Sequence, residues 1–200
     1  MQITNQIVLL STLNEAQIDQ AFHVYVESFF DMLSKTITKD KQKLHAIFKA
    51  CFDYSQVYVY LHEGRVVGFL GWAKMGSHAL KPNRNVLQKH LGALPGAVVH
   101  WALNYYQPKA ESETQAIIEY LAVDPDARGK GIGAKLIQHL CNSLAYRSYT
   151  LETTAENTSA VRLYTKMGFS RLPKKLSPLV RVFARVCDLG TPILMKLELP

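Results

Sequence analysis

Residues 117–133 place a glycine-rich bend between an apolar strand and a helix, an arrangement that can bind an anion with backbone groups alone. Gly129, Gly131 and Gly133 have no Cβ, so the chain can turn tightly and direct successive amides to one point. The helix that follows leaves its first amides unpaired and adds the positive end of its dipole. With Arg128 beside it, the bend predicts a pyrophosphate-binding site.

Gly129, Gly131 and Ala134 also fit the fingerprint of a nicotinamide dinucleotide site, in which Glu152 would bind the ribose. That fingerprint places its first glycine at the end of the strand, whereas residues 124–128 separate the strand from Gly129. The chain after the bend also offers only one further recognisable helix, too few for a doubly wound sheet. This context favours an anionic ligand other than a dinucleotide.

A second motif follows at residues 149–169, which read as strand, polar loop, short helix and glycine stop. Together the two segments resemble the GNAT superfamily of N-acetyltransferases, which use acetyl-CoA. The resemblance is carried by Leu121-x-Val123, by Arg128-Gly-Lys-Gly131-Ile-Gly133, and by Asn157-x-x-Ala160-x-x-Leu163-Tyr164-x-x-x-Gly168-Phe169.

The resemblance implies that the central strand splays from its neighbour and offers its backbone to the pantetheine arm, with the Val123 N–H polarising the thioester carbonyl. Asn157 would cap its helix, contact CoA, or do both. The expected CoA-binding residues are Leu121, Ala122, Val123, Arg128, Gly129, Lys130, Gly131, Ile132, Gly133 and Asn157.

Three side chains are candidates for proton transfer. Tyr164 carries a phenol with an ordinary pKa of about 10, so it can donate to the departing CoA sulfur. Its spacing also fits a core tyrosine, and the surrounding motif favours the functional role. Glu119 should share a strand face with Leu121 and can relay the amine proton. Glu152 is the rival carboxylate, and either acid could instead bind a cationic acceptor or form a structural ion pair.

The composition is that of one soluble globular domain: 200 residues, 48% apolar and 20% charged. No signal peptide or membrane-length apolar run is evident, and the three cysteines are widely spaced. A cytoplasmic setting is therefore expected. The seven histidines form no ligand-like cluster with cysteine, so no metal is expected.

The net charge of +7 suits a polyanionic ligand such as CoA, but also nucleic acid or an anionic membrane. The clearest basic run has no interspersed acid and no aromatic stacking pattern, so it is predicted to be a solvated surface. Its members are Arg162, Lys166, Arg171, Lys174, Lys175, Arg181 and Arg185. Neither nucleic acid nor membrane is an expected partner.

Hydrophobic spacing predicts the elements that must position these residues. Residues 6–11 are expected to form a first strand, and residues 14–33 and 39–52 two one-faced helices. Asn14 and Gln17 predict a capping box at the start of the first helix.

The strongest hairpin signal pairs residues 56–61 with 66–73 across a turn at 63–64. Gly68 and Gly71 weaken the second strand and predict a bulge or a close approach of another segment.

Residues 76–113 form a long insertion with helical spacing at 86–91 and 98–106, broken at residues 94–96. It could reach the acceptor side, or be a helical decoration whose aromatics pack into a small core of their own. Its chemically capable side chains are His78, Lys81, Arg84, Lys89, His90, Trp101, Tyr105 and Tyr106.

Downstream, Ile132, Leu136, Leu140 and Leu144 predict a buried helical stripe, and residues 179–186 and 193–199 predict two strands. The expected fold is one α/β domain spanning residues 1–200. Its single mixed, mostly antiparallel sheet would contain about seven strands, with helices on both faces.

The predicted function is transfer of an acetyl group from acetyl-CoA to a primary amine by direct attack in a ternary complex. The competing hypothesis is a non-catalytic acyl-CoA-binding regulatory module, against which Tyr164 and Glu119 argue. The acceptor, a small-molecule or peptide amine, is not specified, because its walls would come from residues 14–52 and 76–113. A homodimer is among the oligomeric states that the sequence allows.

Overall fold

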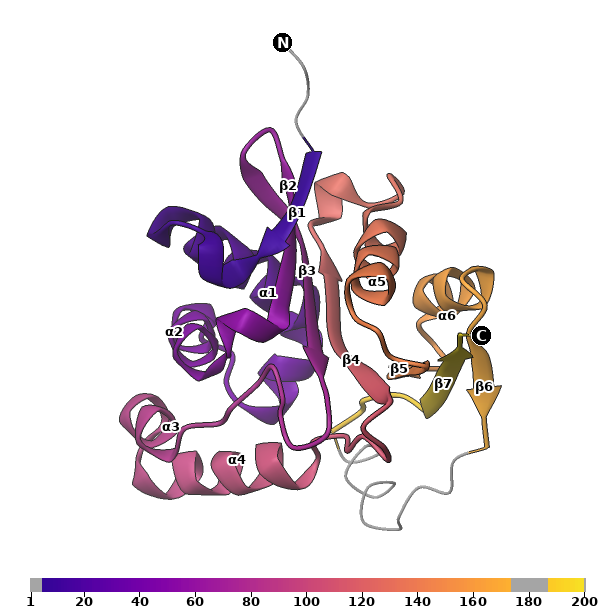
Figure 1. Ribbon diagram of the computed structural model, residues 1–200. Coiled ribbons are helices and arrows are strands. Elements are labelled where there is room, and N and C mark those ends of the chain that lie inside the picture. Colours follow the sequence, from indigo (N-terminus) through magenta and orange to yellow (C-terminus); the bar gives the residue numbers. More distant parts are fainter. Residues whose placement is uncertain (1–4, 174–186, 200) are drawn as a thin grey trace.

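Seven strands form one sheet in the order β1-β2-β3-β4-β5-β7-β6 in the computed structural model, which describes residues 5–173 and 187–199 (Figure 1). The strands are β1 (Asn5–Leu9), β2 (Val57–His62), β3 (Arg65–Ala73), β4 (Gln115–Val123), β5 (Ser148–Thr154), β6 (Ser170–Leu172) and β7 (Pro192–Glu198). β4 and β5 run parallel, whereas the other neighbouring pairs are antiparallel. The predicted mixed, mostly antiparallel sheet is confirmed.

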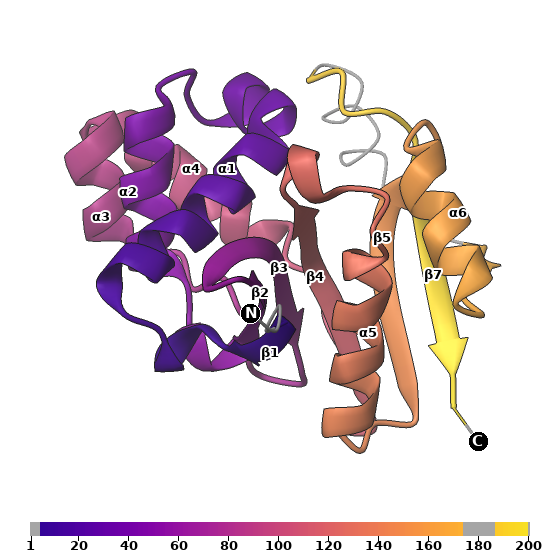
Figure 2. The ribbon, with the colours of Figure 1, turned by 90° about the horizontal axis from the view of Figure 1, so that it is seen from above.

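Helices cover both faces of this sheet. They are α1 (Glu15–Thr36), α2 (Lys41–Cys51), α3 (Arg84–Leu91), α4 (Ala93–Tyr105), α5 (Ile132–Ser143) and α6 (Thr158–Lys166). Seen from above, α1 to α4 lie on one side and α5 and α6 on the other (Figure 2). The sheet therefore separates the insertion from the glycine bend, which precedes α5.

Each face has its own hydrophobic core. Under α1 and α2, aromatic rings dominate, and Phe22, Tyr25 and Phe69 are at most 1% exposed. Under α5, the predicted stripe is confirmed, because Leu136 and Leu140 are fully buried against the sheet. β4 lies between these two cores and carries several residues of the candidate active site.

Only one of the two hydrogen bonds of the predicted capping box forms at the start of α1. The Asn14 side chain accepts a hydrogen bond from the Gln17 amide at 3.0 Å. The Gln17 side chain does not return to Asn14 but donates to the carbonyl of Gly64 in the β2–β3 turn, also at 3.0 Å. The cap thus ties α1 to the hairpin.

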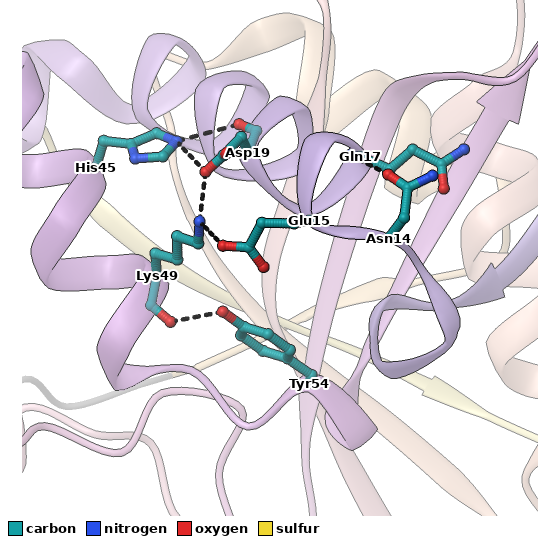
Figure 3. A network of polar contacts seen from close by, with 7 residues as sticks. All are labelled: Asn14, Glu15, Gln17, Asp19, His45, Lys49 and Tyr54. Atoms are coloured by element: carbon teal, nitrogen blue, oxygen red, sulfur yellow. Dashed lines mark hydrogen bonds and ion pairs between the residues drawn. The ribbon is translucent and has the colours of Figure 1, made fainter.

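Lys49 of α2 joins α1 through two carboxylates (Figure 3). Its Nζ lies 2.5 Å from Glu15 and 2.6 Å from Asp19. Asp19 also contacts His45, and the Tyr54 hydroxyl donates to the Lys49 carbonyl at 2.8 Å. The hydrogen bonds that the Lys49 ammonium donates to Asp19 and Glu15 raise its pKa. These contacts hold the start of α1 against the end of α2.

Lys49→Met should lower the free energy of unfolding by about 1 kcal/mol at low salt, because it keeps the aliphatic stem and removes two partly exposed ion pairs. Since the pKa of Lys49 is raised, the ammonium stabilises the fold fully below the ordinary lysine pKa, and this contribution is lost only as the pH rises through the raised value. Urea unfolding at neutral pH measures the effect. A loss of stability that stays the same at molar salt would contradict an ionic origin.

Both glycines of β3 lie beneath packed side chains next to irregularities of the sheet. A Cβ on Gly68 would stand 2.8 Å from the Ile132 side chain, and one on Gly71 would stand 3.1 Å from Tyr120. The β2–β3 register shifts between Tyr60 and Leu61, and the β3–β4 register shifts just after Gly71. The predicted bulges and close approaches are both confirmed.

The insertion folds as a helical hairpin, but the predicted break at residues 94–96 is wrong. The chain turns at Gly92, whose φ is +93°. Pro95 lies in the first turn of α4, where a missing N–H costs no hydrogen bond. Gly96 is the point where the helices touch, because a Cβ there would lie 2.5 Å from the backbone of Gln88.

The aromatic residues of α4 do not form a core of their own, contrary to one of the two hypotheses for the insertion. Trp101 and Tyr105 stack with ring centroids 5.2 Å apart and remain 57% and 49% exposed. The aliphatic residues of the hairpin instead join the core under α1 and α2; these are Val86, Leu87, Leu91, Val99 and Leu103.

Among the tail elements, the strand predicted at 193–199 is confirmed as β7, whereas the one predicted at 179–186 lies outside the described residues. Arg162, Lys166 and Arg171 of the basic run are exposed. The other members of that run, Lys174, Lys175, Arg181 and Arg185, also fall outside the described residues.

Candidate active site

The two central strands separate halfway along β4. β4 pairs with β5 only through residues 115–118, while β5 continues to pair with β7 as far as Thr154. Residues 119–121 are only half-buried although they belong to a central strand, which marks the opening. A strand edge without a partner offers N–H and C=O groups to a ligand.

The backbone of Leu121 and Val123 faces this opening. The Asp124 amide donates to the Val67 carbonyl of β3 at 3.0 Å, and amides alternate sides along an antiparallel strand. The amides of Leu121 and Val123 therefore point to the β5 side. The Val123 carbonyl on that side accepts a hydrogen bond from Arg128 Nε at 3.1 Å. The side chain of Ala122 is buried in the core under α1.

The glycine bend has the open, left-handed backbone that an anion cradle needs. Gly129 and Gly131 have φ values of +78° and +74°, and a Cβ on either would have no atom within 4 Å. Gly131 caps α5 without a side-chain hydrogen bond, so the first amides of the helix stay available. Arg128 and Lys130 are exposed beside it. The Ile132 side chain is buried, which leaves its amide as the group that can meet a ligand.

Gly133 is where the motifs from distant parts of the sequence meet. A Cβ at this position would lie 3.2 Å from Leu163 of α6, 3.5 Å from Leu121 and 3.9 Å from Val123. Glycine thus lets the start of α5 pack directly against α6 and the open end of β4. The anion cradle, the free strand edge and the Tyr164 helix consequently share one junction.

Tyr164 is buried, with 7% of its surface exposed, and packs against Phe169 at a ring-centroid distance of 5.9 Å. Burial raises its pKa to about 12, so the phenol keeps its proton at neutral pH. Its hydroxyl makes no hydrogen bond with any described residue. Asn157 caps α6, accepting from the Ala160 amide at 3.2 Å and from Ser159 Oγ at 3.0 Å. Its capping role is confirmed, and its contact with CoA stays a prediction.

Glu119 does not share the face of Leu121, contrary to the prediction from strand alternation. Gly71 and Trp72 of β3 pair with Tyr120 and Ile118, which leaves Glu119 as the extra residue of a bulge. Ile118 packs in the core under α5, and Tyr120 packs under α1. The Glu119 carboxylate also turns to the α1 face, where it meets residues that follow β3.

His78 and Ala79 are those residues. Glu119 Oε1 lies 2.6 Å from His78 Nδ1, and Oε2 accepts the Ala79 amide at 2.9 Å. The Glu119 side chain is 2% exposed and that of His78 is 20% exposed. Sequence reasoning placed His78 in the insertion without a role, because no local pattern links it to a residue 41 positions away. The rival Glu152 is exposed on β5, opposite Leu194 of β7.

The described residues contain no group of three or more His, Cys, Asp or Glu side chains that could hold a metal ion. Over the same part of the chain, every helix is too short or too polar to cross a membrane. A hollow beside α1 is lined in part by Asp19, His23 and Asp124, and neither Tyr164 nor Glu119 is among its lining residues.

A mixed sheet whose central strands part beside a glycine bend, with helices on both faces, defines the class of acetyltransferases that share the GNAT fold. The model of the Acetyltransferase (GNAT) family matches residues 18–169, and the chain belongs to this family. An N-acetyltransferase from Staphylococcus aureus Mu50 superposes with a TM-score of 0.62 at 18% identity, covering 96% of this chain and 100% of that one.

Relatives of higher identity match over shorter stretches. Mycothiol acetyltransferase of Actinosynnema mirum is 37% identical over 73 residues, which is 34% of this chain and 24% of the relative. [Ribosomal protein bS18]-alanine N-acetyltransferase of Salmonella typhimurium is 37% identical over 59 residues, or 28% of this chain and 40% of the relative. The chain thus matches less than half the length of either relative.

Proposed function

We propose that this chain transfers an acetyl group from acetyl-CoA to a primary amine by direct attack within a ternary complex. The observation that carries the proposal is the junction at Gly133, where the anion cradle, the free edge of β4 and the helix bearing Tyr164 meet. In this proposal the pyrophosphate binds the amides of the bend, and the pantetheine lies along the β4 edge. The Val123 N–H then polarises the thioester carbonyl.

The amine nitrogen forms its bond to the thioester carbon, the C–S bond breaks, and the sulfur takes the Tyr164 proton to leave as the CoA thiol. Direct attack is supported by the raised pKa values of two cysteine thiols. Burial raises the pKa of the Cys141 thiol to about 11 and also raises that of Cys51, so neither is a ready nucleophile. Cys51, Cys141 and Cys187 form no disulfide, which supports the proposed cytoplasmic setting.

The acceptor is proposed to enter from the α1–α4 side, because Glu119 turns to that face at the level where β4 and β5 part. The names of the two relatives differ in the chemistry that they mention, one naming mycothiol and the other a ribosomal-protein alanine. A small-molecule amine and a peptide amine are therefore both proposed classes.

Acetyl-CoA should stabilise the fold by about 2.7 kcal/mol at a concentration 100 times its Kd, and NAD should have little effect. For a chain of this size the melting temperature should rise by roughly 5–10 °C. Thermal unfolding with each ligand measures this difference. Stabilisation by NAD with indifference to acetyl-CoA would restore the dinucleotide hypothesis.

Release of free CoA thiol from acetyl-CoA, measured with a panel of small and peptide amines, tests turnover. Amine-dependent release is the expected result. Tight acetyl-CoA binding without release for any amine would instead support the non-catalytic acyl-CoA-binding module.

A further inference from the structure

We propose that His78 is the group that takes the proton from the acceptor amine, and that Glu119 is the positioning residue that holds its ring. The inference rests on the proposed acetyl transfer and names a further residue for it. It arises from the bulge in β4, which turns Glu119 away from the face of Leu121 and toward the segment that follows β3.

Glu119 is poorly placed to meet an acceptor directly. Its side chain is 2% exposed, and each carboxylate oxygen already has a partner. Oε1 lies 2.6 Å from His78 Nδ1, and Oε2 accepts a hydrogen bond from the Ala79 amide at 2.9 Å. Because these partners are consecutive residues, the carboxylate fixes both the backbone and the ring of His78.

His78 has the opposite exposure. With Nδ1 donating to the carboxylate, Nε2 carries the lone pair and remains the free corner of a ring that is 20% exposed. No described residue forms a hydrogen bond with Nε2. A pair that only stabilised the core would gain from burying both partners, whereas here the His78 side chain stays 20% exposed while Glu119 is buried.

The acceptor nitrogen loses two protons in the reaction, and His78, Tyr164 and solvent account for both. The ammonium of the acceptor gives one proton to His78 Nε2, and the Glu119 carboxylate stabilises the imidazolium that forms. The neutral amine then attacks the thioester carbon, and the CoA sulfur leaves with the Tyr164 proton. The second proton lost from the amide nitrogen restores the phenol through solvent, and His78 releases its proton to solvent.

Other charged or titratable groups near the His78–Glu119 pair are Tyr25 of α1 and Tyr120 of β4, which interact with Glu119, and the Asp53–Lys81 pair that flanks Ala79. Burial raises the pKa of both phenols, and Lys81 lowers the pKa of Asp53. These groups keep their protonation state around neutral pH. A change of activity around neutral pH therefore does not come from these groups.

The test compares His78→Asn, Glu119→Gln and the control His62→Gln, whose ring contacts Asn5 at the far end of β2. Asparagine can keep a donor near the position of Nδ1 while it removes Nε2. We expect His78→Asn to lower kcat by about 10- to 100-fold and to abolish the acidic limb of its pH profile, with the Kd for acetyl-CoA unchanged. Glu119→Gln should shift that limb to lower pH, and the control should match the wild type.

A limb that persists in His78→Asn but vanishes in Glu119→Gln would overturn the inference and make Glu119 the base. If His78→Asn leaves kcat unchanged and raises the KM for the amine, the pair binds the acceptor but takes no proton from it. That result would also overturn the inference. The histidine tautomer, read by ¹⁵N NMR, tests the pair without turnover. An Nδ1–H ring in the wild type is expected, and an Nε2–H ring would overturn the inference even if acetyl transfer is established. Absence of turnover with every amine would count against the proposed function alone.

Discussion

Gly131→Val is expected to raise the Kd for acetyl-CoA by about 10²–10³-fold, because it removes two or more charge-assisted hydrogen bonds of roughly 1.5–3 kcal/mol each. At a φ of +74°, a β-branched residue is strained, and its side chain would stand in the open space where the pyrophosphate is proposed to bind. The backbone would relax out of the left-handed region and turn its amides away from the ligand. Isothermal titration with acetyl-CoA measures the change.

Backbone strain also lowers stability, so the experiment needs a control that carries the strain without the ligand site. Gly64→Val offers one, since Gly64 has a φ of +80°, no atom within 4 Å of a Cβ, and a place in the distant β2–β3 turn. It should lose a similar amount of stability and bind acetyl-CoA normally. Equal affinities in Gly131→Val and the wild type would place the anion site elsewhere.

Arg128→Ala should be milder than Gly131→Val. Arg128 adds one exposed charge to the bend and donates to the Val123 carbonyl, while the amide cradle does not depend on it. A loss of affinity of about tenfold is expected for one exposed charge-assisted contact. A loss that exceeds that of Gly131→Val, measured by the same titration, would make side-chain charge the main source of binding.

Tyr164→Phe is expected to lower kcat by about 10²–10³-fold while leaving the Kd for acetyl-CoA unchanged, because a general acid acts in the reaction step and not in binding. The ring keeps its packing against Phe169, and only the hydroxyl disappears. Because the pKa of Tyr164 is raised to about 12, the phenol should remain a proton donor throughout the neutral and moderately alkaline range. No alkaline loss of kcat from this group is expected until the pH approaches that value.

Tyr149→Phe is the matched control. Tyr149 belongs to the same core and its pKa is also raised to about 12, but its hydroxyl donates to the Leu144 carbonyl at 2.7 Å. Its loss should lower the free energy of unfolding by about 1 kcal/mol and leave kcat intact. Equal kcat values for Tyr164→Phe and the wild type would return Tyr164 to the role of a core tyrosine.

Local sequence determined the elements of the fold to a large extent. The periodicity of α1, α5 and the β2–β3 hairpin was readable, because each face repeats at the interval of its own backbone geometry. The glycine bend could also be predicted, since left-handed φ values at Gly129 and Gly131 are a local requirement that glycine meets. The resemblance to GNAT enzymes added the order in which these pieces belong.

Pairings between distant segments could not be predicted in the same way. A strand pattern of period two placed Glu119 on the face of Leu121, but one unpaired residue in β4 reverses that face. Whether such a bulge forms depends on the register with β3, which in turn depends on packing around Gly71. The contact with His78 is a consequence of this register, and it joins residues 41 positions apart.

The sequence by itself therefore determined the glycine bend and most of the helices and strands. The tertiary structure decided three further points: which face receives Glu119, which residue meets it, and that Trp101 and Tyr105 stay exposed. The physical reason is the distance along the sequence over which each effect acts. Backbone periodicity and glycine conformations act within a few residues, whereas strand register and core packing are settled only when distant segments meet.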